Sequence, residues 1–379
     1  MSEGRSDVVI VGGGLVGCAA ALHLRERGAS VAVVEKNQLG AAASGVNFGG
    51  VRRNGRKLAE LGIAARALAV WKRLPALVGS DCEYQITGNI KVARNEADMV
   101  QIAAHAEAQA DYGVEVEMLS RNALLDRFPW LGPGAYGAAY CPSDGQANPR
   151  LVGPAFARAA RAAGATLIEL DGATHVARDG GDFVVETESG RSLRGGALIN
   201  ASGAWGARLA AQFGEQVEIW PMEPQMAVTE PAPYFMEPVL AVVGGDVYAR
   251  QIPRGNVIFG GRSGTADLDV GFGKVDAEEN LTTLARTAAI IPRVADLAVI
   301  RFWSGVEGCT PDHLPILCQS RTTPGLVHAF GFSGHGFCLG PASGAVAAEL
   351  ALDGRTDTPI EGFDIARFDA TTPGEGAGA

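Results

Sequence analysis

The stretch that decides the fold is DVVIVGGGLVGCAAALHLRERGASVAVVE, residues 7–35. It opens with an apolar, β-branched run, Val8–Val11, which is typical of a parallel strand buried on both faces. Gly12, Gly14 and Gly17 follow in the spacing G-x-G-x-x-G. In that spacing the first glycine allows a tight turn, the second lets the backbone approach a pyrophosphate, and the third brings helix close to strand. The stretch therefore predicts the start of a nucleotide-binding β-α-β unit.

The remainder of the stretch completes this unit. Small and apolar residues recur at helical spacing from Leu15 to Arg27, and Gly28 is placed to end the helix. A second strand, Val31–Val34, leads to Glu35, whose carboxylate can accept hydrogen bonds from a ribose 2′-hydroxyl and would repel a 2′-phosphate. Because all the parts occur in the right order, a glycine-rich turn without a ligand is a much weaker interpretation. We expect a dinucleotide with its pyrophosphate at the helix N-terminus.

Length and composition restrict the class of protein. With 379 residues, of which 47% are hydrophobic and 20% charged, the chain is long enough for two folded domains. Lys plus Arg number 32 and Asp plus Glu 42, a net charge of −10, which disfavours nucleic acid or an anionic membrane as a partner. The six cysteines include no C-x-x-C pair, which argues against zinc, an iron–sulfur cluster or a disulfide scaffold and favours a reducing cytoplasm. The glycine-interrupted N-terminal stretch is neither a signal peptide nor a membrane span, and we expect no integral membrane segment.

Hydrophobic periodicity and turn residues predict the later elements. Helices are expected at residues 58–77, 95–112, 149–163, 276–291 and 341–352. Strands are expected at residues 83–92, 136–140, 166–170, 175–178, 183–187, 191–194, 197–201, 221–229, 240–243, 247–252, 257–261, 299–304 and 325–331. The strands between 166 and 194 predict a small meander, and those between 221 and 261 an antiparallel sheet. Residues 371–379 are Gly, Ala, Pro, Thr and Glu, and predict a disordered tail.

Four segments carry a resemblance to a known family: the glycine turn at 12–35, the small residues of 41–53, the strand end at 200–205, and the stretch 310–344 with its Thr-Pro-Asp and Leu-Pro-Ile. The chain resembles the FAD-dependent amine and amino-acid oxidoreductases, which include D-amino-acid oxidase, glycine oxidase and sarcosine oxidase. The resemblance implies an α/β fold with a Rossmann-type FAD-binding domain at 1–80, 141–215 and 305–370. Residues 81–140 and 216–304 would then form a second, antiparallel-sheet α+β substrate domain.

The resemblance also implies which residues hold the cofactor. Gly305 stands where sarcosine oxidases have their flavin-attaching cysteine, so we expect FAD to be bound non-covalently. Val176 would meet the adenine through its backbone, and the glycine-rich loop before the last helix would lie at the flavin, where the helix N-terminus favours negative charge. The residues implied in cofactor binding are Gly12, Gly14, Leu15, Val16, Gly17, Glu35, Lys36, Ser44, Asn47, Val176, Ala201, Gly203, Trp205, Gly331, Gly334, His335, Gly336 and Phe337.

Four side chains are the candidates for substrate chemistry. Glu307 stands where many family members have an arginine that grips the substrate carboxylate, so the anion is bound elsewhere or the substrate presents a cationic group to Glu307. Arg53 aligns with the arginine that receives the carboxylate in sarcosine oxidase, whereas a solvated pair with Arg52 is the alternative. Tyr248 lines the pocket or is a core tyrosine with a satisfied hydroxyl, and His335 is a base or a residue beside the cofactor. No metal ligands are predicted.

The function that the resemblance implies is oxidation of a small, secondary amine or amino acid at the carbon bearing nitrogen. FAD would take the hydride, and the imine would hydrolyse to an oxo acid and an amine. Oxygen or another electron acceptor would reoxidise the flavin. The alternatives are a 2-hydroxy-acid flavin dehydrogenase, which would need a base such as histidine, an electron-transferring subunit of a heteromeric amine oxidase with partner subunits, and a catalytically silent FAD-binding protein.

Overall fold

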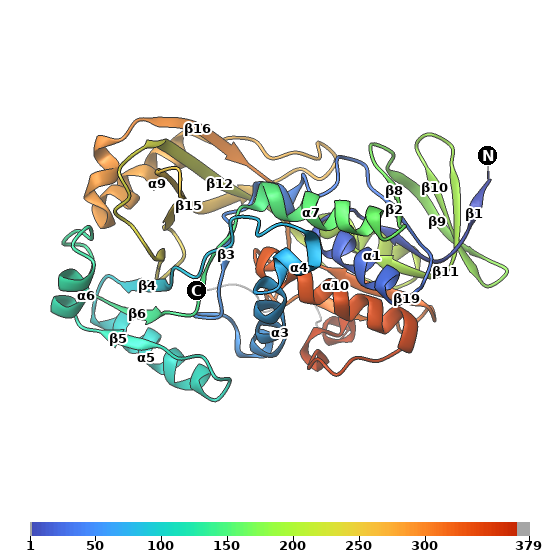
Figure 1. Ribbon diagram of the computed structural model, residues 1–379, viewed down its shortest axis with the longest axis horizontal. Coiled ribbons are helices and arrows are strands. Elements are labelled where there is room, and N and C mark those ends of the chain that lie inside the picture. The colour runs from blue at the N-terminus through green and yellow to red at the C-terminus, as the bar shows by residue number, and fades with distance from the viewer. Residues whose placement is uncertain (1, 370–379) are drawn as a thin grey trace.

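The structure is a computed structural model that describes residues 2–369 (Figure 1). The predicted tail at 371–379 lies outside these residues. Two large sheets organise the described part of the chain, which also contains a short pair of strands, β3 (Gly50–Val51) and β7 (Gly145–Gln146).

The first sheet contains the N-terminal strand and has eight strands within the described residues. Its spatial order is β18 (Ile316–Gln319), β19 (Leu326–Phe330), β11 (Ser192–Asn200), β1 (Ser2–Val11), β2 (Val31–Val34) and β8 (Thr166–Ile168), and the hairpin of β9 (Ala173–Asp179) and β10 (Asp182–Thr187) extends it beside β11. The pairs β19–β11, β11–β1, β1–β2 and β2–β8 are parallel. The predicted α/β fold with a Rossmann-type unit is confirmed.

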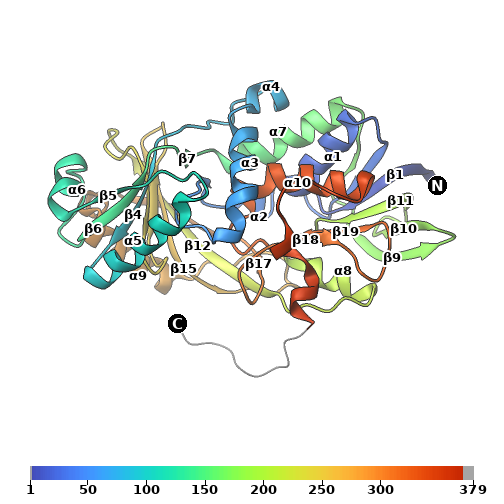
Figure 2. The same ribbon diagram turned by 90° about the horizontal axis from the view of Figure 1, so that it is seen from below.

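Both faces of this sheet are covered, which explains the unbroken apolar run of its first strand. Val8 and Ile10 pack into a core with helix residues on one face, while Val9 packs with residues of β10 on the other. On the first face, α1 (Leu15–Glu26) packs against α7 (Pro149–Ala162) and α10 (Gly336–Asp353), and α10 packs against α3 (Leu61–Trp71). Figure 2 shows α3 and α10 side by side.

The second sheet has nine strands within the described residues. Its order is β16 (Val299–Ser304), β12 (Trp220–Pro231), β15 (Asn256–Thr265), β14 (Tyr248–Gln251), β13 (Val239–Val242), β4 (Asn89–Ala93), β6 (Gly137–Cys141) and β5 (Glu117–Leu119), and β17 (Glu307–Cys309) pairs with β12. The pairs are antiparallel except β13–β4, which is parallel. The predicted antiparallel sheet is thus confirmed apart from this one junction, where a strand from early in the chain joins strands from later.

Helices cover the outer face of the second sheet. Residues of α9 (Ala277–Ile290) and α6 (Arg121–Arg127) share one core with β4, β13 and β15. Figure 1 shows α9 beside β12 and β15 at the end of the molecule away from the N-terminus. The remaining helices are α2 (Ala43–Val46), α4 (Leu74–Val78), α5 (Glu96–Ala110) and α8 (Gly206–Gln212), with short 3-10 turns at Leu58–Glu60, Gly203–Trp205, Pro292–Asp296, Glu361–Phe363 and Ile365–Phe368.

Several predicted elements differ from the structure. The strand expected at 83–92 is limited to β4 at its end, and β1 begins at Ser2, before the expected Val8. The helix expected at 58–77 is divided into a 3-10 turn, α3 and α4, and Pro75 stands in the first turn of α4. Because proline fits only a first helical turn without loss of a hydrogen bond, it begins a new helix there. The strands expected at 191–194 and 197–201 are one strand, β11, because β1 pairs along its length while β10 and β19 pair with successive halves on its other side.

A further difference concerns the loop that precedes the last helix. The sequence predicts that this helix begins at Pro341, but α10 begins at Gly336 and contains Pro341. Phe337 and Cys338 are buried in its first turn, and the indole Nε1 of Trp71 donates a hydrogen bond of 2.8 Å to the carbonyl oxygen of Cys338. Tertiary packing therefore holds the residues before the proline in helical conformation.

Candidate active site

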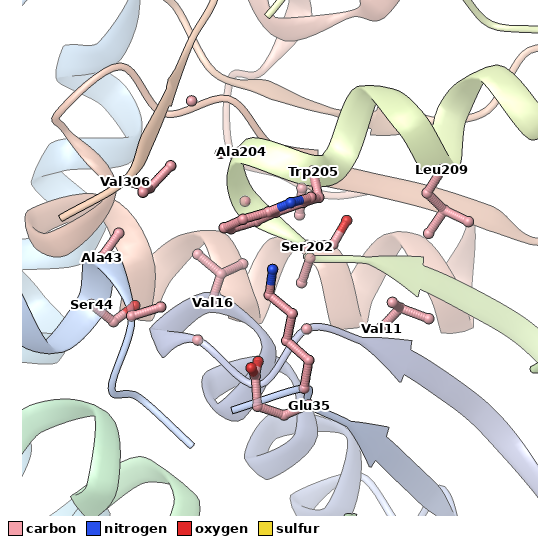
Figure 3. Close-up of a pocket in the computed structure, with 18 of the residues that line it drawn as sticks. Val11, Val16, Glu35, Ala43, Ser44, Ser202, Ala204, Trp205, Leu209 and Val306 are labelled. Atoms are coloured by element: carbon pink, nitrogen blue, oxygen red, sulfur yellow. The ribbon is translucent and has the colours of Figure 1, made fainter. Parts of the chain in front are cut away.

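A cavity of about 480 Å³ lies at the carboxyl ends of the parallel strands of the first sheet. Its lining includes Val11, the last residue of β1, and Glu35, Ala201 and Gly331, which directly follow β2, β11 and β19. Figure 3 shows Val11, Val16 and Glu35 on one side of this cavity and Trp205 across from them. In an open α/β sheet this edge is where nucleotide ligands bind.

The glycine turn approaches its neighbours too closely for any side chain. Gly12 has φ +106°, and a Cβ there would stand 2.3 Å from the carbonyl oxygen of Ala201. A Cβ on Gly17 would stand 1.9 Å from the carbonyl oxygen of Gly12. The backbone N–H groups of Gly14 and Val16 donate no hydrogen bond within the described residues, although they lie at the N-terminus of α1. Unsatisfied donors on a helix N-terminus fit a diphosphate.

The acid after β2 is fixed by backbone groups. The carboxylate of Glu35 accepts hydrogen bonds of 2.7 Å from the N–H of Gly13 and 2.7 Å from the N–H of Asn37. The ammonium of Lys36 lies 3.1 Å from the centre of the Trp205 ring. These residues form a rigid acceptor with a cation–aromatic wall beside it, which fits the ribose of a dinucleotide.

The short helix α2 is tied to the N-terminus of α1. The hydroxyl of Ser44 accepts a hydrogen bond of 2.9 Å from the N–H of Leu15. The amide of Asn47 donates to the carbonyl oxygens of Ala43 and Ser44 at 3.0 and 2.9 Å, and accepts from the N–H of Gly49 at 2.8 Å. Asn47 therefore fixes the turn that carries the chain from the first sheet toward the second.

Glu307 lies at the other end of the cavity, beside the glycine-rich loop. It begins β17 and lines the cavity with Gly334 and Phe337, and its side chain makes no hydrogen bond or ion pair with any described residue. Burial raises the pKa of Glu307 to about 7. A desolvated carboxyl without a partner in a cavity is a feature of functional sites.

Tyr248 stands close to Glu307 without lining the cavity. Its hydroxyl donates to the sulfur of Met226 at 3.3 Å, and its ring packs edge-on against Phe48, with 4.8 Å between the ring centres. Burial raises the pKa of Tyr248, and the charge of Glu307 raises it further. The phenol is therefore neutral at physiological pH.

The two adjacent arginines have different surroundings, and neither lines the cavity at the strand ends. The backbone N–H of Arg53 donates a hydrogen bond of 2.8 Å to the carboxylate of Asp144, and the buried Nε of its side chain has no hydrogen-bond partner. The charge of Arg53 acts on the thiol of Cys141. Burial lowers the pKa of Arg52 to about 10, and the charge of Arg52 contributes, after burial, to lowering the pKa of Lys91 to about 8. Arg52 thus lies near Lys91, on the second sheet.

His335 lies outside the cavity lining, as the residue that precedes α10. Burial lowers its pKa to about 4, so its imidazole is neutral, and Nδ1 bonds to the carboxylate of Glu60 at 2.7 Å. Glu60 is fully buried and Arg56 lies 3.8 Å from it. The histidine is held by this carboxylate and is not free to act as a base in the cavity.

Sixteen of the predicted cofactor residues line the cavity, and the two that do not are Gly17 and His335. Of the four candidates for substrate chemistry, only Glu307 lines it. The sequence interpretation missed other lining residues, among them Thr174, His175, Glu188, Ser202 and Arg208. His175 adjoins the predicted Val176, but Arg208 lies on a helix with no motif that could have marked it.

Two features are absent from the described residues. Between residues 2 and 369, no group of three or more His, Cys, Asp or Glu side chains is arranged to hold a metal ion. No helix in the same range is long and apolar enough to cross a bilayer. All six cysteines are buried free thiols.

Comparisons with known proteins agree with this geometry. Residues 7–350 match the model of a family described as FAD dependent oxidoreductase. The chain is 31% identical over 378 residues to a glycine oxidase of Geobacillus kaustophilus, covering 97% of both chains. It is 28% identical over 386 residues to an opine oxidase subunit of Rhizobium meliloti, covering 96% of this chain and 98% of the relative.

A solved structure extends the agreement to three dimensions. The crystal structure of L-proline dehydrogenase from P. horikoshii superimposes with a TM-score of 0.90 at 27% identity, covering 97% of this chain and 99% of that one. The predicted cofactor, FAD, is confirmed, and the residues around the cavity fit a dinucleotide as described above. Because the match runs through nearly the whole chain and includes both ends of the cavity, this chain belongs to the family of FAD-dependent oxidoreductases.

Proposed function

We propose that the protein oxidises a small, secondary amine or amino acid at the carbon that bears nitrogen, giving an imine that water hydrolyses to an oxo acid and an amine. Glu307 carries this proposal. It is an unpaired carboxyl at the end of the cavity, with a pKa raised by burial, and it is complementary to a substrate ammonium. The names of the relatives, a glycine oxidase and an opine oxidase subunit, support a nitrogen-bearing substrate.

In this proposal the chain's own residues prepare the substrate. FAD, when bound, supplies a two-electron acceptor for the hydride. Glu307 orients the ammonium and takes its proton, because a carboxyl with a pKa of about 7 is a competent base near neutral pH. The N-terminus of α10, beside Gly336 and Phe337, gives positive potential to this end of the cavity.

The substrate carboxylate needs a cation, for which the sequence interpretation names Arg53. That assignment stays a prediction. The surroundings of Arg52 make it a better candidate than Arg53 for binding the substrate carboxylate. The charge of Arg52 lies near Lys91 of the second sheet, and its backbone carbonyl oxygen accepts a hydrogen bond from the thiol of Cys338 on α10. Arg53, by contrast, lies near Cys141.

The 2-hydroxy-acid alternative finds less support, because a hydroxy acid presents no ammonium to the Glu307 carboxylate and no histidine is placed to take the hydroxyl proton. His335 is hydrogen-bonded to Glu60, and the one histidine in the described cavity lining, His175, adjoins Val176 at the predicted adenine end.

The division into an FAD-binding domain (1–80, 141–215, 305–370) and a substrate domain (81–140, 216–304) is retained as part of the proposal. The two separate large sheets support this division, because each proposed domain contains one of them.

The electron acceptor, oxygen or another molecule, and the cytoplasmic location are also part of the proposal. Similarity to one of the subunits of an opine oxidase supports the alternative that partner subunits receive the electrons.

The purified chain should be mixed anaerobically with amines, amino acids and hydroxy acids while flavin absorbance is recorded. We expect secondary amino acids to bleach the flavin and hydroxy acids to leave it oxidised; the reverse result contradicts the proposal. Admitting oxygen or a dye then identifies the acceptor.

A further inference from the structure

A second cavity, of about 350 Å³, adjoins the first at Asn47, which lines both. Its charged lining consists of four arginines and one acid: Arg150, Arg250, Arg254, Arg301 and Glu83. The acid is already engaged, because Glu83 accepts a hydrogen bond of 3.0 Å from Asn148 and lies 3.7 Å from Arg254. A basic cavity in a chain of net charge −10 calls for an anion.

Arg250 is the one buried arginine of this cavity, and it makes no salt bridge or hydrogen bond to a carboxylate, although the charge of Glu83 acts on it. Its side chain is 4% exposed, and its Nη1 donates to the neutral amide oxygen of Gln146 at 2.8 Å. Its Nε is buried without any hydrogen-bond partner, and burial lowers its pKa to about 10. A guanidinium buried without a carboxylate destabilises the fold unless a ligand supplies the charge.

The register of the second sheet places Arg250 on the same face as Tyr248. Both belong to β14, where alternate residues share a face. Tyr248 pairs with Gly260 and Arg250 pairs with Ile258 on β15. Two residues of a strand span about 7 Å, so the Arg250 backbone lies about 7 Å from that of Tyr248, the residue next to Glu307.

Phe48 connects the two positions. Its ring centre lies 4.8 Å from that of Tyr248 and 5.6 Å from the guanidinium carbon of Arg250. The adjacent Gly49 leaves room for the arginine, because a Cβ there would stand 2.7 Å from Nη2 of Arg250. The loop at 47–49 therefore lies between the first cavity, at the strand ends, and the second cavity, which the four arginines line.

From these contacts we propose that Arg250 binds a second, distal carboxylate of the substrate, so that the preferred substrates are secondary amino acids with two carboxylates. This rests on the proposed amine oxidation, because Glu307 must hold the nitrogen for the distal group to reach beyond Phe48. The bidentate geometry of a guanidinium suits a carboxylate, and an amide of the same shape lacks the charge that Arg250 needs. Arg301, exposed on the same face of the sheet, adds positive charge at the rim.

The test uses pairs of substrates that differ only in charge. N-methylglutamate and N-methylglutamine form a long pair, and N-methylaspartate and N-methylasparagine a short one. The flavin-loaded enzyme is mixed anaerobically with each, and the second-order rate constant of flavin bleaching is measured. We expect the wild type to favour the long acid over its amide by at least about tenfold, since a charged hydrogen bond has that strength.

Variants assign this preference to one residue. Arg250→Gln should remove the preference for the acid while leaving the amide rate within about threefold of wild type. Arg250→Lys keeps the charge and should retain part of the preference. Arg262→Gln is the matched control, because Arg262 is an exposed arginine of β15 that lines neither cavity, and this variant should keep the preference. Flavin content and circular dichroism check that each variant is folded.

Binding of an unreactive acid gives a second readout. Glutarate has two carboxylates and no amine, so calorimetry with the oxidised enzyme should detect its binding to wild type and not to Arg250→Gln, and glutaramic acid should bind more weakly. Equal rates for acid and amide in the wild type, or equal losses for both in Arg250→Gln, overturn the inference. Oxidation of monocarboxylic amines alone overturns this inference and leaves the proposed function standing. Bleaching by no amine contradicts the proposed function and, with it, the substrate preference; glutarate binding then shows only whether Arg250 holds a carboxylate.

Discussion

Glu307 combines cavity exposure with the absence of a partner, and its titration should control substrate binding. A charged carboxylate attracts a cationic amine, so kcat/KM should rise as pH increases through about 7, the pKa to which burial raises Glu307. In Glu307→Gln this rise should disappear, and kcat/KM above about pH 8 should fall by roughly ten- to a hundredfold, the value of a charged hydrogen bond. Stopped-flow flavin reduction at a series of pH values measures both. An unaltered pH profile would remove Glu307 from the substrate site.

The same shift affects stability with a definite sign. The folded pKa of about 7 lies above the ordinary value of 4.5, so the unfolded carboxyl ionises first as pH rises. Stability linked to Glu307 should therefore be fully present below pH 4.5 and be lost as pH rises toward about 7. The difference in Tm between Glu307→Gln and wild type should therefore shift in favour of the variant as pH rises across that interval. Calorimetry without substrate measures this difference.

The adjacent arginines allow a matched pair of variants. Arg52→Met should raise KM for substrates with a carboxylate by about tenfold or more, because its charge lies near Lys91 beside the second sheet. Arg53→Met should have the smaller effect, since its charge lies near Cys141. Steady-state kinetics on both variants, with a neutral amine as control substrate, compares them. A larger rise for Arg53→Met would restore the sequence-based assignment.

Single residues were predictable where backbone geometry dictates them. Gly12 and Gly14 follow from a motif whose spacing has one structural meaning. Arg250 was not singled out, although the alternation of VYARQI already places it on the face of Tyr248. Its burial depends on Phe48, Gly49 and Gln146, which are distant in sequence, and local periodicity contains no information on such contacts.

At the scale of elements, the turn between β1 and α1 gives a sharp comparison. Gly12→Ala and Gly28→Ala both place a side chain at positive φ, +106° and +83°. The added Cβ at Gly12 would stand 2.3 Å from the Ala201 carbonyl oxygen, whereas nothing lies within 4 Å at Gly28. Gly28→Ala should cost roughly 1–2 kcal/mol and retain the flavin. Gly12→Ala should yield protein without flavin, as absorbance spectra would show; a yellow Gly12→Ala protein would contradict the turn geometry.

Elements were predictable where a strong period or a cap defines them. The helices α1, α5, α7 and α9 and the strand β2 lie within a few residues of their predicted ranges, and β1 ends at the predicted Val11 although it begins earlier, at Ser2. The start of α10 was missed because Trp71, far earlier in the chain, fixes the backbone at Cys338. The continuity of β11 through Gly195 and Gly196 was missed because three strands pair with it at once.

At the scale of the whole molecule, the cavity lining predicts how the cofactor is attached. Neither cysteine nor tyrosine lines the described part of the cavity, and His175 adjoins Val176 at the predicted adenine end. Acid precipitation should therefore release all flavin into the supernatant. A yellow pellet would show a covalent bond and contradict the prediction.

The order of strands in both sheets was not predictable from the sequence, since it depends on pairings such as β13 with β4.

The strand order of the first sheet has a consequence for biosynthesis. Its neighbours β1, β11 and β19 begin at residues 2, 192 and 326. A nascent chain emerging from the ribosome thus cannot complete the floor of the flavin cavity until most of it has been translated. Capture of the coenzyme should be a late, all-or-none event, and chains that stop before Phe330 should be colourless substrates for proteases.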